Sequence, residues 1–426
     1  MKRFFYLIAC MVLSSGMLLD AFAMPSQPPS SKVIFERVKH SVVQIRTLLK
    51  GSQSQSSIGS GFYVSADGLI ISNYHVVSSH ALQPETYTME YVDSQGAHGT
   101  LRLLAIDVLH DLALLQRDGQ HLPGLSLQSA SPAQGETLHS LGNPNDLGLS
   151  IVTGVNNGLR EHSFYEAMHF TGALNPGMSG GPVVNQANEV VGINEATMGQ
   201  SRSFLVPAKF AVELLTHWQQ HPVIPPKFRP EIARQLKQHS ATLTKRLTSK
   251  PFPVQIDAGY AIPDTPDPYI RCWANEFNEP KVFYQMRTYR CSGRAGVFVE
   301  DDISLGQVSF SSQLYQTSKL DFWRFGRVLE RNYGTLGDGN FDGPDDYVSN
   351  YACQDSMLNL QGLRAKVALC TRAYRKLPGL YDIYLKLVTL EHQQDALVSK
   401  LDLVGVTYED GMHIVQAYLG VFKWKK

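Results

Sequence analysis

The sequence has no excess of charge of either sign, because its 426 residues include 38 lysines and arginines and 38 aspartates and glutamates. A chain without net charge has no bulk attraction to nucleic acid or to anionic lipid, so we expect no nucleic-acid partner. Beyond residue 23 the sequence also lacks an apolar run of the ~20 residues that a membrane-spanning helix needs. We therefore expect no transmembrane segment in the mature chain.

Cysteine is scarce, and the five cysteines are unevenly placed. Cys10 lies near the N-terminus, and the other four, Cys272, Cys291, Cys353 and Cys370, lie in the C-terminal half. No pair has the C-x-x-C spacing of structural zinc sites, so we expect no metal. An even number of cysteines in an exported chain predicts two disulfides, for which three pairings exist. We favour the two short loops, Cys272–Cys291 and Cys353–Cys370.

The first residues indicate export. A basic start is followed by the apolar run 4–19 and by the small-x-small sequence that ends at Ala23. This pattern predicts a signal peptide over 1–23, cleaved near Ala23, and a mature protein that is periplasmic or secreted. The alternatives are an uncleaved membrane anchor and lipid attachment at Cys10, which ends the lipobox-like sequence LIAC. Residues 24–32 are polar and rich in proline, which predicts a disordered leader.

Beyond the leader, the pattern of predicted strands, helices and prolines changes twice along the sequence. Residues 33–220 read as many short strands separated by turns, with one closing helix over 207–219, which predicts an all-β barrel or sandwich. Residues 221–268 are rich in proline around one polar helix, which predicts a connector between domains.

Residues 269–426 mix the two kinds of pattern. The run 381–390 reads as a strand, whereas 391–401 and 412–422 read as helices. We therefore expect an α+β domain that is stapled by its cysteines. The D-x-N-x-D-G spacing that starts at Asp338 fits either a calcium loop or an ordinary Asx turn, since Ser349 stands where a calcium loop has glutamate.

A serine between glycines is the first candidate for chemistry. Ser179 lies in the turn 175–182, with the sequence NPGMSGGP. Glycine gives this backbone the freedom to point the N–H groups of Gly177 and Ser179 at one oxygen. Two such donors stabilise the negative charge that develops during acyl transfer. A serine hydroxyl is a weak nucleophile alone, so this interpretation needs a base and an acid elsewhere.

His75 and Asp111 are the candidates for those two roles. His75 follows two strand-like runs across an Asp-Gly turn, and Asp111 runs directly into the apolar strand 112–115. A carboxylate at the edge of an apolar strand needs a partner, and an imidazole is one. Asp107 is the rival acid. The chain order His, Asp, Ser is that of one known serine-protease triad, in which His takes the serine proton and Asp holds the imidazole tautomer.

The motifs around these residues resemble the trypsin-like serine proteases of the HtrA/DegP type. The matching stretches are GSGF at 59–62, DGLIISNYHVV at 67–77, DLALL at 111–115, LGNP at 141–144, NPGMSGGP at 175–182 and VVGIN at 190–194. The resemblance implies a double β-barrel with the site between the barrels. It also implies His75 as general base, Asp111 as its orienter, Ser179 as nucleophile, and an oxyanion hole from the N–H groups of Gly177 and Ser179.

Two departures limit what the resemblance implies. Met178 stands where the family commonly has asparagine, and nothing after residue 220 resembles a PDZ domain. We therefore predict an exported serine endopeptidase that acts on protein or peptide substrates without a cofactor and carries a C-terminal domain of another kind. The alternative is a catalytically inactive binding or chaperone protein of the bacterial envelope, built on the same fold.

Overall fold

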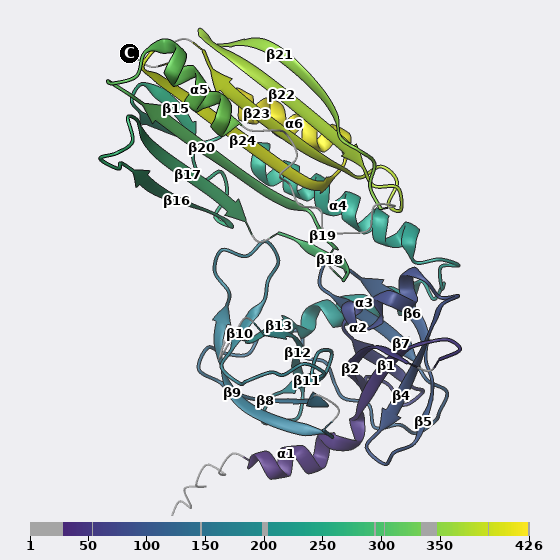
Figure 1. Ribbon diagram of the computed structural model, residues 1–426. Coiled ribbons are helices and arrows are strands. Elements are labelled where there is room, and N and C mark those ends of the chain that lie inside the picture. Colours follow the sequence, from purple (N-terminus) through teal and green to yellow (C-terminus); the bar gives the residue numbers. More distant parts are fainter. Residues whose placement is uncertain are drawn as a thin grey trace, which may run out of the picture.

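The computed structural model describes residues 29–424 except 53, 145–146, 198–202, 294, 302, 334–346 and 391. The predicted signal peptide and the candidate calcium loop at Asp338 therefore lie outside the described residues, as does most of the leader. Helix α1 (Ser31–Val38) includes the last two residues of the expected leader. Figure 1 shows two lobes, one built from α1–α3 with β1–β13 and one from the later strands, with α4 and the β18–β19 hairpin between them.

The first lobe begins with a seven-stranded antiparallel sheet in the order β5-β4-β1-β2-β3-β7-β6. Its strands are β1 (Val42–Leu49), β2 (Gln55–Tyr63), β3 (Leu69–Ser72), β4 (Tyr87–Asp93), β5 (His98–Thr100), β6 (Arg102–Asp107) and β7 (Leu112–Gln116). Only Leu101 separates the two edge strands β5 and β6, and its N–H donates to the carbonyl of Met89 in β4. The chain itself therefore joins the two edges, and the sheet closes on itself as a barrel does.

A second, closed barrel follows in the order β10-β13-β12-β11-β8-β9. Its strands are β8 (Thr137–Gly142), β9 (Ser150–Leu159), β10 (Met168–Phe170), β11 (Pro182–Val184), β12 (Val190–Thr197) and β13 (Ser203–Pro207). Phe62 and Ile71 of the first sheet share one core with Leu141 and Ile193 of the barrel. Helix α3 (Ala208–Gln220) packs on this core, as the sequence predicted for 207–219. The all-β, two-barrel expectation is confirmed.

The second lobe is a seven-stranded antiparallel sheet in the order β16-β17-β20-β24-β23-β22-β21. Its strands are β16 (Ile270–Phe277), β17 (Gln285–Gly293), β20 (Gln307–Gln316), β21 (Ala352–Leu360), β22 (Leu363–Ala373), β23 (Tyr381–Thr389) and β24 (Asp395–Val406). Helices α4 (Arg229–Thr248) and α6 (Tyr408–Leu419) share a core with one face of the sheet, and α5 (Phe322–Tyr333) packs on the other. Helices on an antiparallel sheet give this lobe an α+β character.

The disulfides are those favoured from the sequence. Cys272–Cys291 joins β16 to β17, and Cys353–Cys370 joins β21 to β22. Because β16 and β21 are the two edge strands of the sheet, each disulfide fastens an edge to its neighbour. Loops of this length stabilise a fold by about 3 kcal/mol each in the chain-entropy model.

The helix expected over 391–401 is wrong, because this stretch lies largely in β24. Leu397 and Leu401 contribute to the core beneath α6, whereas Ala396 and Val398 contribute to the core beneath α5. A strand that is buried on both faces has no clear alternation of apolar and polar residues, so periodicity alone did not distinguish it from a helix.

Residues 221–268 are more than a spacer. Ile232 and Leu236 of α4 belong to the core of the first sheet, and Leu243 and Leu247 belong to that of the second lobe. The segment also holds the two-stranded sheet of β14 (Val254–Asp257) and β15 (Tyr260–Pro263). A second small sheet, β18 (Val297–Glu300) with β19 (Ile303–Leu305), leaves the second lobe and packs against the first. In the described part of the chain, no helix has both the length and the apolar character to cross a bilayer.

Candidate active site

His75 is positioned by a helix, where the sequence suggested the end of a strand. Strand β3 stops at Ser72, and α2 (Tyr74–Leu82) begins two residues later, so His75 lies in its first turn. The backbone carbonyl of Asp111 fixes this turn, because it accepts hydrogen bonds from the Asn73 side chain (2.8 Å) and from the N–H of Tyr74 (3.1 Å). These contacts from β7's entry residue override the strand preference of Val76 and Val77.

The carboxylate of Asp111 makes two contacts with His75. Oδ1 accepts a hydrogen bond from the His75 backbone N–H at 2.8 Å, and Oδ2 lies 2.6 Å from the ring Nδ1. Asp111 itself has a φ of 54°, an uncommon backbone conformation for a residue other than glycine. The rival acid, Asp107, lies 2.7 Å from Nδ1 of His110 instead. The structure therefore pairs His75 with Asp111 and His110 with Asp107.

The loop that carries Ser179 is held in place by the first sheet. The Ser60 hydroxyl donates to the carbonyl of Gly177, and its N–H donates to that of Ser179, both at 2.7 Å. Gly177 and Gly180 have φ values of 93° and 82°, and a Cβ on Gly180 would meet the Ser60 carbonyl oxygen at 2.2 Å. Glycine is therefore required at 180. The N–H groups of Gly177 and Ser179 donate to no described residue, so both are available to a ligand oxygen.

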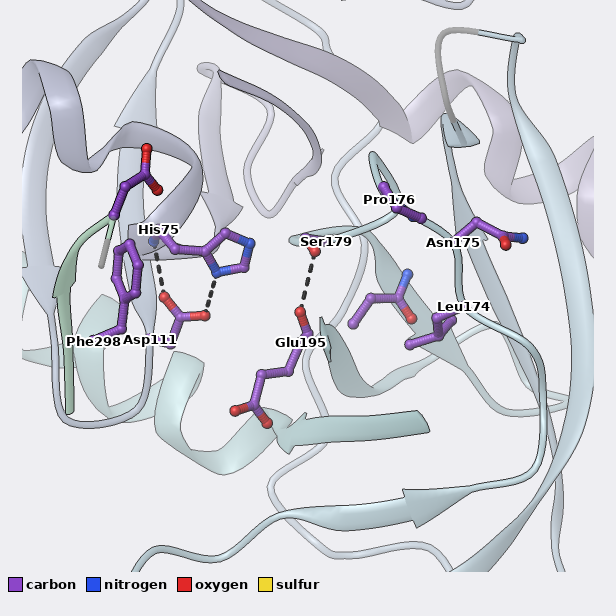
Figure 2. A pocket seen from close by; sticks show the side chains of 10 residues that line it. His75, Asp111, Leu174, Asn175, Pro176, Ser179, Glu195 and Phe298 are labelled. Carbon is purple, nitrogen blue, oxygen red and sulfur yellow. Dashed lines mark hydrogen bonds and ion pairs between the residues drawn. The ribbon is translucent and has the colours of Figure 1, made fainter. Parts of the chain in front are cut away.

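The hydroxyl of Ser179 does not contact the imidazole. It donates to the backbone carbonyl of Glu195 at 3.1 Å. Ser179, His75 and Asp111 nevertheless line one open cleft of about 460 Å³. Figure 2 shows the His75 ring between Asp111 and Ser179, with the serine loop on the other side of the cleft. A rotation of the serine side chain is needed to bring its oxygen toward the ring.

Acidic groups surround the imidazole. Burial lowers the pKa of His75, but the charge and hydrogen bond of Asp111, with the charges of Glu195 and Asp301, raise it above the ordinary value of 6.5. Burial and the Asp111 charge raise the pKa of Glu195 to about 7, against the opposing effect of His75 and Arg160. The carboxyl groups of this cleft therefore stabilise the imidazolium that His75 forms when it gains a proton.

Residues 59–193 match the family model of the trypsin-like peptidase domain. Over this range the chain is similar to trypsin-like peptidase domains. The matched range contains His75, Asp111 and Ser179, and it spans the two barrels from β2 to β12.

Curated relatives share this domain. The chain is 31% identical over 198 residues to the "Probable periplasmic serine endoprotease DegP-like" of Ectopseudomonas mendocina, which covers 44% of the chain and 40% of the relative. It is 32% identical over 201 residues to the human "Serine protease HTRA3", which covers 44% of each. The HtrA/DegP resemblance is thus confirmed, although the chain spans less than half the length of these relatives.

Solved structures are also similar. The crystal structure of the serine endoprotease from Yersinia pestis matches with a TM-score of 0.40 at 24% identity, over 46% of this chain and 68% of that one. The expected lack of a PDZ domain stays a prediction.

Three residues of the cleft escaped sequence reasoning, namely Glu195, Phe298 and Asp301. Glu195 comes directly after the VVGIN motif, which placed its strand but not the direction of its side chain. Phe298 and Asp301 belong to the β18–β19 hairpin, and no signal in the sequence connects that hairpin to the peptidase domain. Among the described residues, no group of histidine, cysteine and carboxylate side chains could hold a metal ion.

Proposed function

We propose that this protein is an exported serine endopeptidase that hydrolyses peptide bonds through an acyl-enzyme. The observation that carries the proposal is the His75–Asp111 pair, with its 2.6 Å contact, in one cleft with Ser179. The backbone N–H groups of Gly177 and Ser179 lie beside it and donate to no described residue. The relatives, a DegP-like serine endoprotease and the serine protease HTRA3, support the same activity.

In this mechanism Ser179 attacks the scissile carbonyl while Nε2 of His75 takes its proton. The Asp111 carboxylate holds the Nδ1 proton and stabilises the imidazolium that forms. The N–H groups of Gly177 and Ser179 donate to the oxyanion, and His75 then returns the proton to the leaving amine. Water then attacks the acyl-enzyme through the same steps, with His75 taking its proton and returning it to Ser179. The hydroxyl of Ser179 must first leave the Glu195 carbonyl and turn to His75.

Export and domain organisation are part of the proposal. Two disulfides favour an oxidising compartment, and the DegP-like relatives carry "periplasmic" in their names. We propose cleavage near Ala23, a peptidase domain over 33–220, and a C-terminal domain over 269–426 that is joined to it through 221–268.

Ser179→Ala tests the proposal. The purified wild type should react with an active-site phosphonate and cleave denatured proteins, and Ser179→Ala should do neither while keeping the wild-type melting temperature. Ser129→Ala, at an exposed serine outside the cleft, is the control and should keep both activities. A folded wild type that neither reacts nor cleaves would instead favour the inactive binding or chaperone protein.

A further inference from the structure

The C-terminal domain contributes part of the wall of the cleft. Phe298 and Asp301, from the β18–β19 hairpin, line the same 460 Å³ space as His75 and Ser179. Figure 2 shows Phe298 beside His75 on the side away from Ser179. The ring centroids of Phe298 and His75 lie 6.0 Å apart, edge to face. A peptide that reaches Ser179 along this cleft would therefore contact the hairpin.

The β18–β19 hairpin is held in place by buried contacts with α2. The Tyr74 hydroxyl donates a 2.8 Å hydrogen bond to the carbonyl of Val299, and both residues are fully buried. Val297, Val299, Ile303 and Leu305 pack in one core with Tyr74, Val76 and Val77 of α2. Since α2 also carries His75, the hairpin and the imidazole are held by the same core.

The charge of this wall selects its ligand. The cleft is lined by the carboxyl groups of Asp111, Glu195 and Asp301, and among the described lining residues there is no lysine or arginine. Asp111 is engaged by His75, whereas Asp301 is exposed and pairs with no described residue. Phe298 adds an aromatic ring, and such rings attract cations. Nearer the serine, Leu174 and Pro176 offer apolar contact instead.

We propose that Phe298 and Asp301 form a subsite for a lysine or arginine side chain of the substrate, on the side of His75 away from Ser179. The inference rests on the proposed peptidase function and specifies its substrate class. It gives the C-terminal domain a direct part in choosing where a chain is cut. The apolar subsite beside Leu174 and the cationic subsite beside Phe298 then read two different positions of one peptide.

Cleavage-site mapping tests the inference. A denatured protein mixture digested by the wild type should show lysine and arginine enriched at one fixed position relative to the cut. Two fluorogenic peptides that differ only there, lysine against glutamine, should then differ in kcat/KM by about fivefold, as expected for a partly solvated ion pair. The difference should shrink as salt is added, because salt screens exposed charges.

Variants assign the preference to its residues. Asp301→Asn should bring the lysine-to-glutamine ratio close to one, and Phe298→Leu should reduce it about twofold. Asp301→Lys should create a preference for a glutamate peptide, a gain that a folding defect cannot imitate. Asp118→Asn removes the same charge at a fully exposed side chain outside the cleft and should leave the ratio unchanged.

The outcomes separate this inference from the function on which it rests. A wild type that reacts with the phosphonate but shows no cationic preference, or an Asp301→Asn variant with an unchanged ratio, overturns the subsite and leaves the peptidase proposal standing. A wild type that neither reacts nor cleaves overturns both.

Discussion

The hydroxyl of Tyr74 donates a hydrogen bond of 2.8 Å to the backbone carbonyl of Val299. Tyr74 directly precedes the proposed general base, and Val299 belongs to the other lobe of the molecule. Neither residue is exposed to solvent. One buried contact therefore links the position of the imidazole to the fold of the C-terminal domain.

Tyr74→Phe should weaken this link. The substitution leaves a buried carbonyl without its donor, which costs about 1–3 kcal/mol of unfolding free energy. We expect kcat/KM to fall as well, because the start of α2 loses a support. Tyr63→Phe is a matched control in the first sheet, where the tyrosine hydroxyl accepts from Arg117 far along the chain from the hairpin. Urea unfolding and turnover of both variants check the prediction. Equal losses of activity in Tyr74→Phe and Tyr63→Phe would contradict it.

Asp111→Asn should reduce kcat by up to ~10⁴, because an amide cannot hold the imidazole in the required tautomer. Asp107→Asn should have a small effect, since Asp107 contacts His110 and not His75. Steady-state kinetics of the two variants provide the measurement. If Asp107→Asn is the damaging change, the assignment of the acid is wrong.

The acid side of the pH profile should report His75. The base must be neutral to accept the serine proton, and its neighbours raise its pKa above 6.5. We therefore expect kcat/KM of the wild type to decline, as pH falls, at a pH above that of an ordinary histidine. Glu195→Gln removes one of the charges that raise this pKa, so its decline should move to lower pH. A decline that stays in place, or moves upward, would contradict the assigned electrostatics.

Glu195 should also make stability depend on pH. Its pKa rises from 4.5 to about 7 in the folded protein, so the folded state binds more protons than the unfolded state between these values. Stability from this group is complete below pH 4.5 and is lost as pH rises through about 7. When the pH is raised from 5 to 8, the free energy of unfolding of Glu195→Gln should increase by about 1–3 kcal/mol relative to that of the wild type.

Urea unfolding at the two pH values measures that gain. Glu161→Gln is the control, because the Glu161 side chain is 90% exposed and should show no such gain. If both variants show the same change in unfolding free energy between the two pH values, burial does not raise the pKa of Glu195.

The sequence predicted those parts of the site that short motifs carry. The glycines around Ser179, the turn before β3 and the strand after Asp111 each have a local pattern, and together they identified all three proposed catalytic residues. The helix at His75 was not predicted, because contacts with the Asp111 backbone, and not local preference, start it. Phe298 and Asp301 were not predicted either, because only packing of the hairpin on α2 brings them to the cleft.

The core that Tyr74 shares with the hairpin has a practical consequence for dividing this protein. A chain shortened to residues 33–220 would lose Val297, Val299, Ile303 and Leu305, together with Ile232 and Leu236 of α4. The apolar face of α2 that packs on the hairpin would then be exposed to solvent. Separate preparations of the two halves should therefore aggregate or reassociate. Limited proteolysis should accordingly yield a nicked but intact particle, since the pieces stay joined through the core around α2.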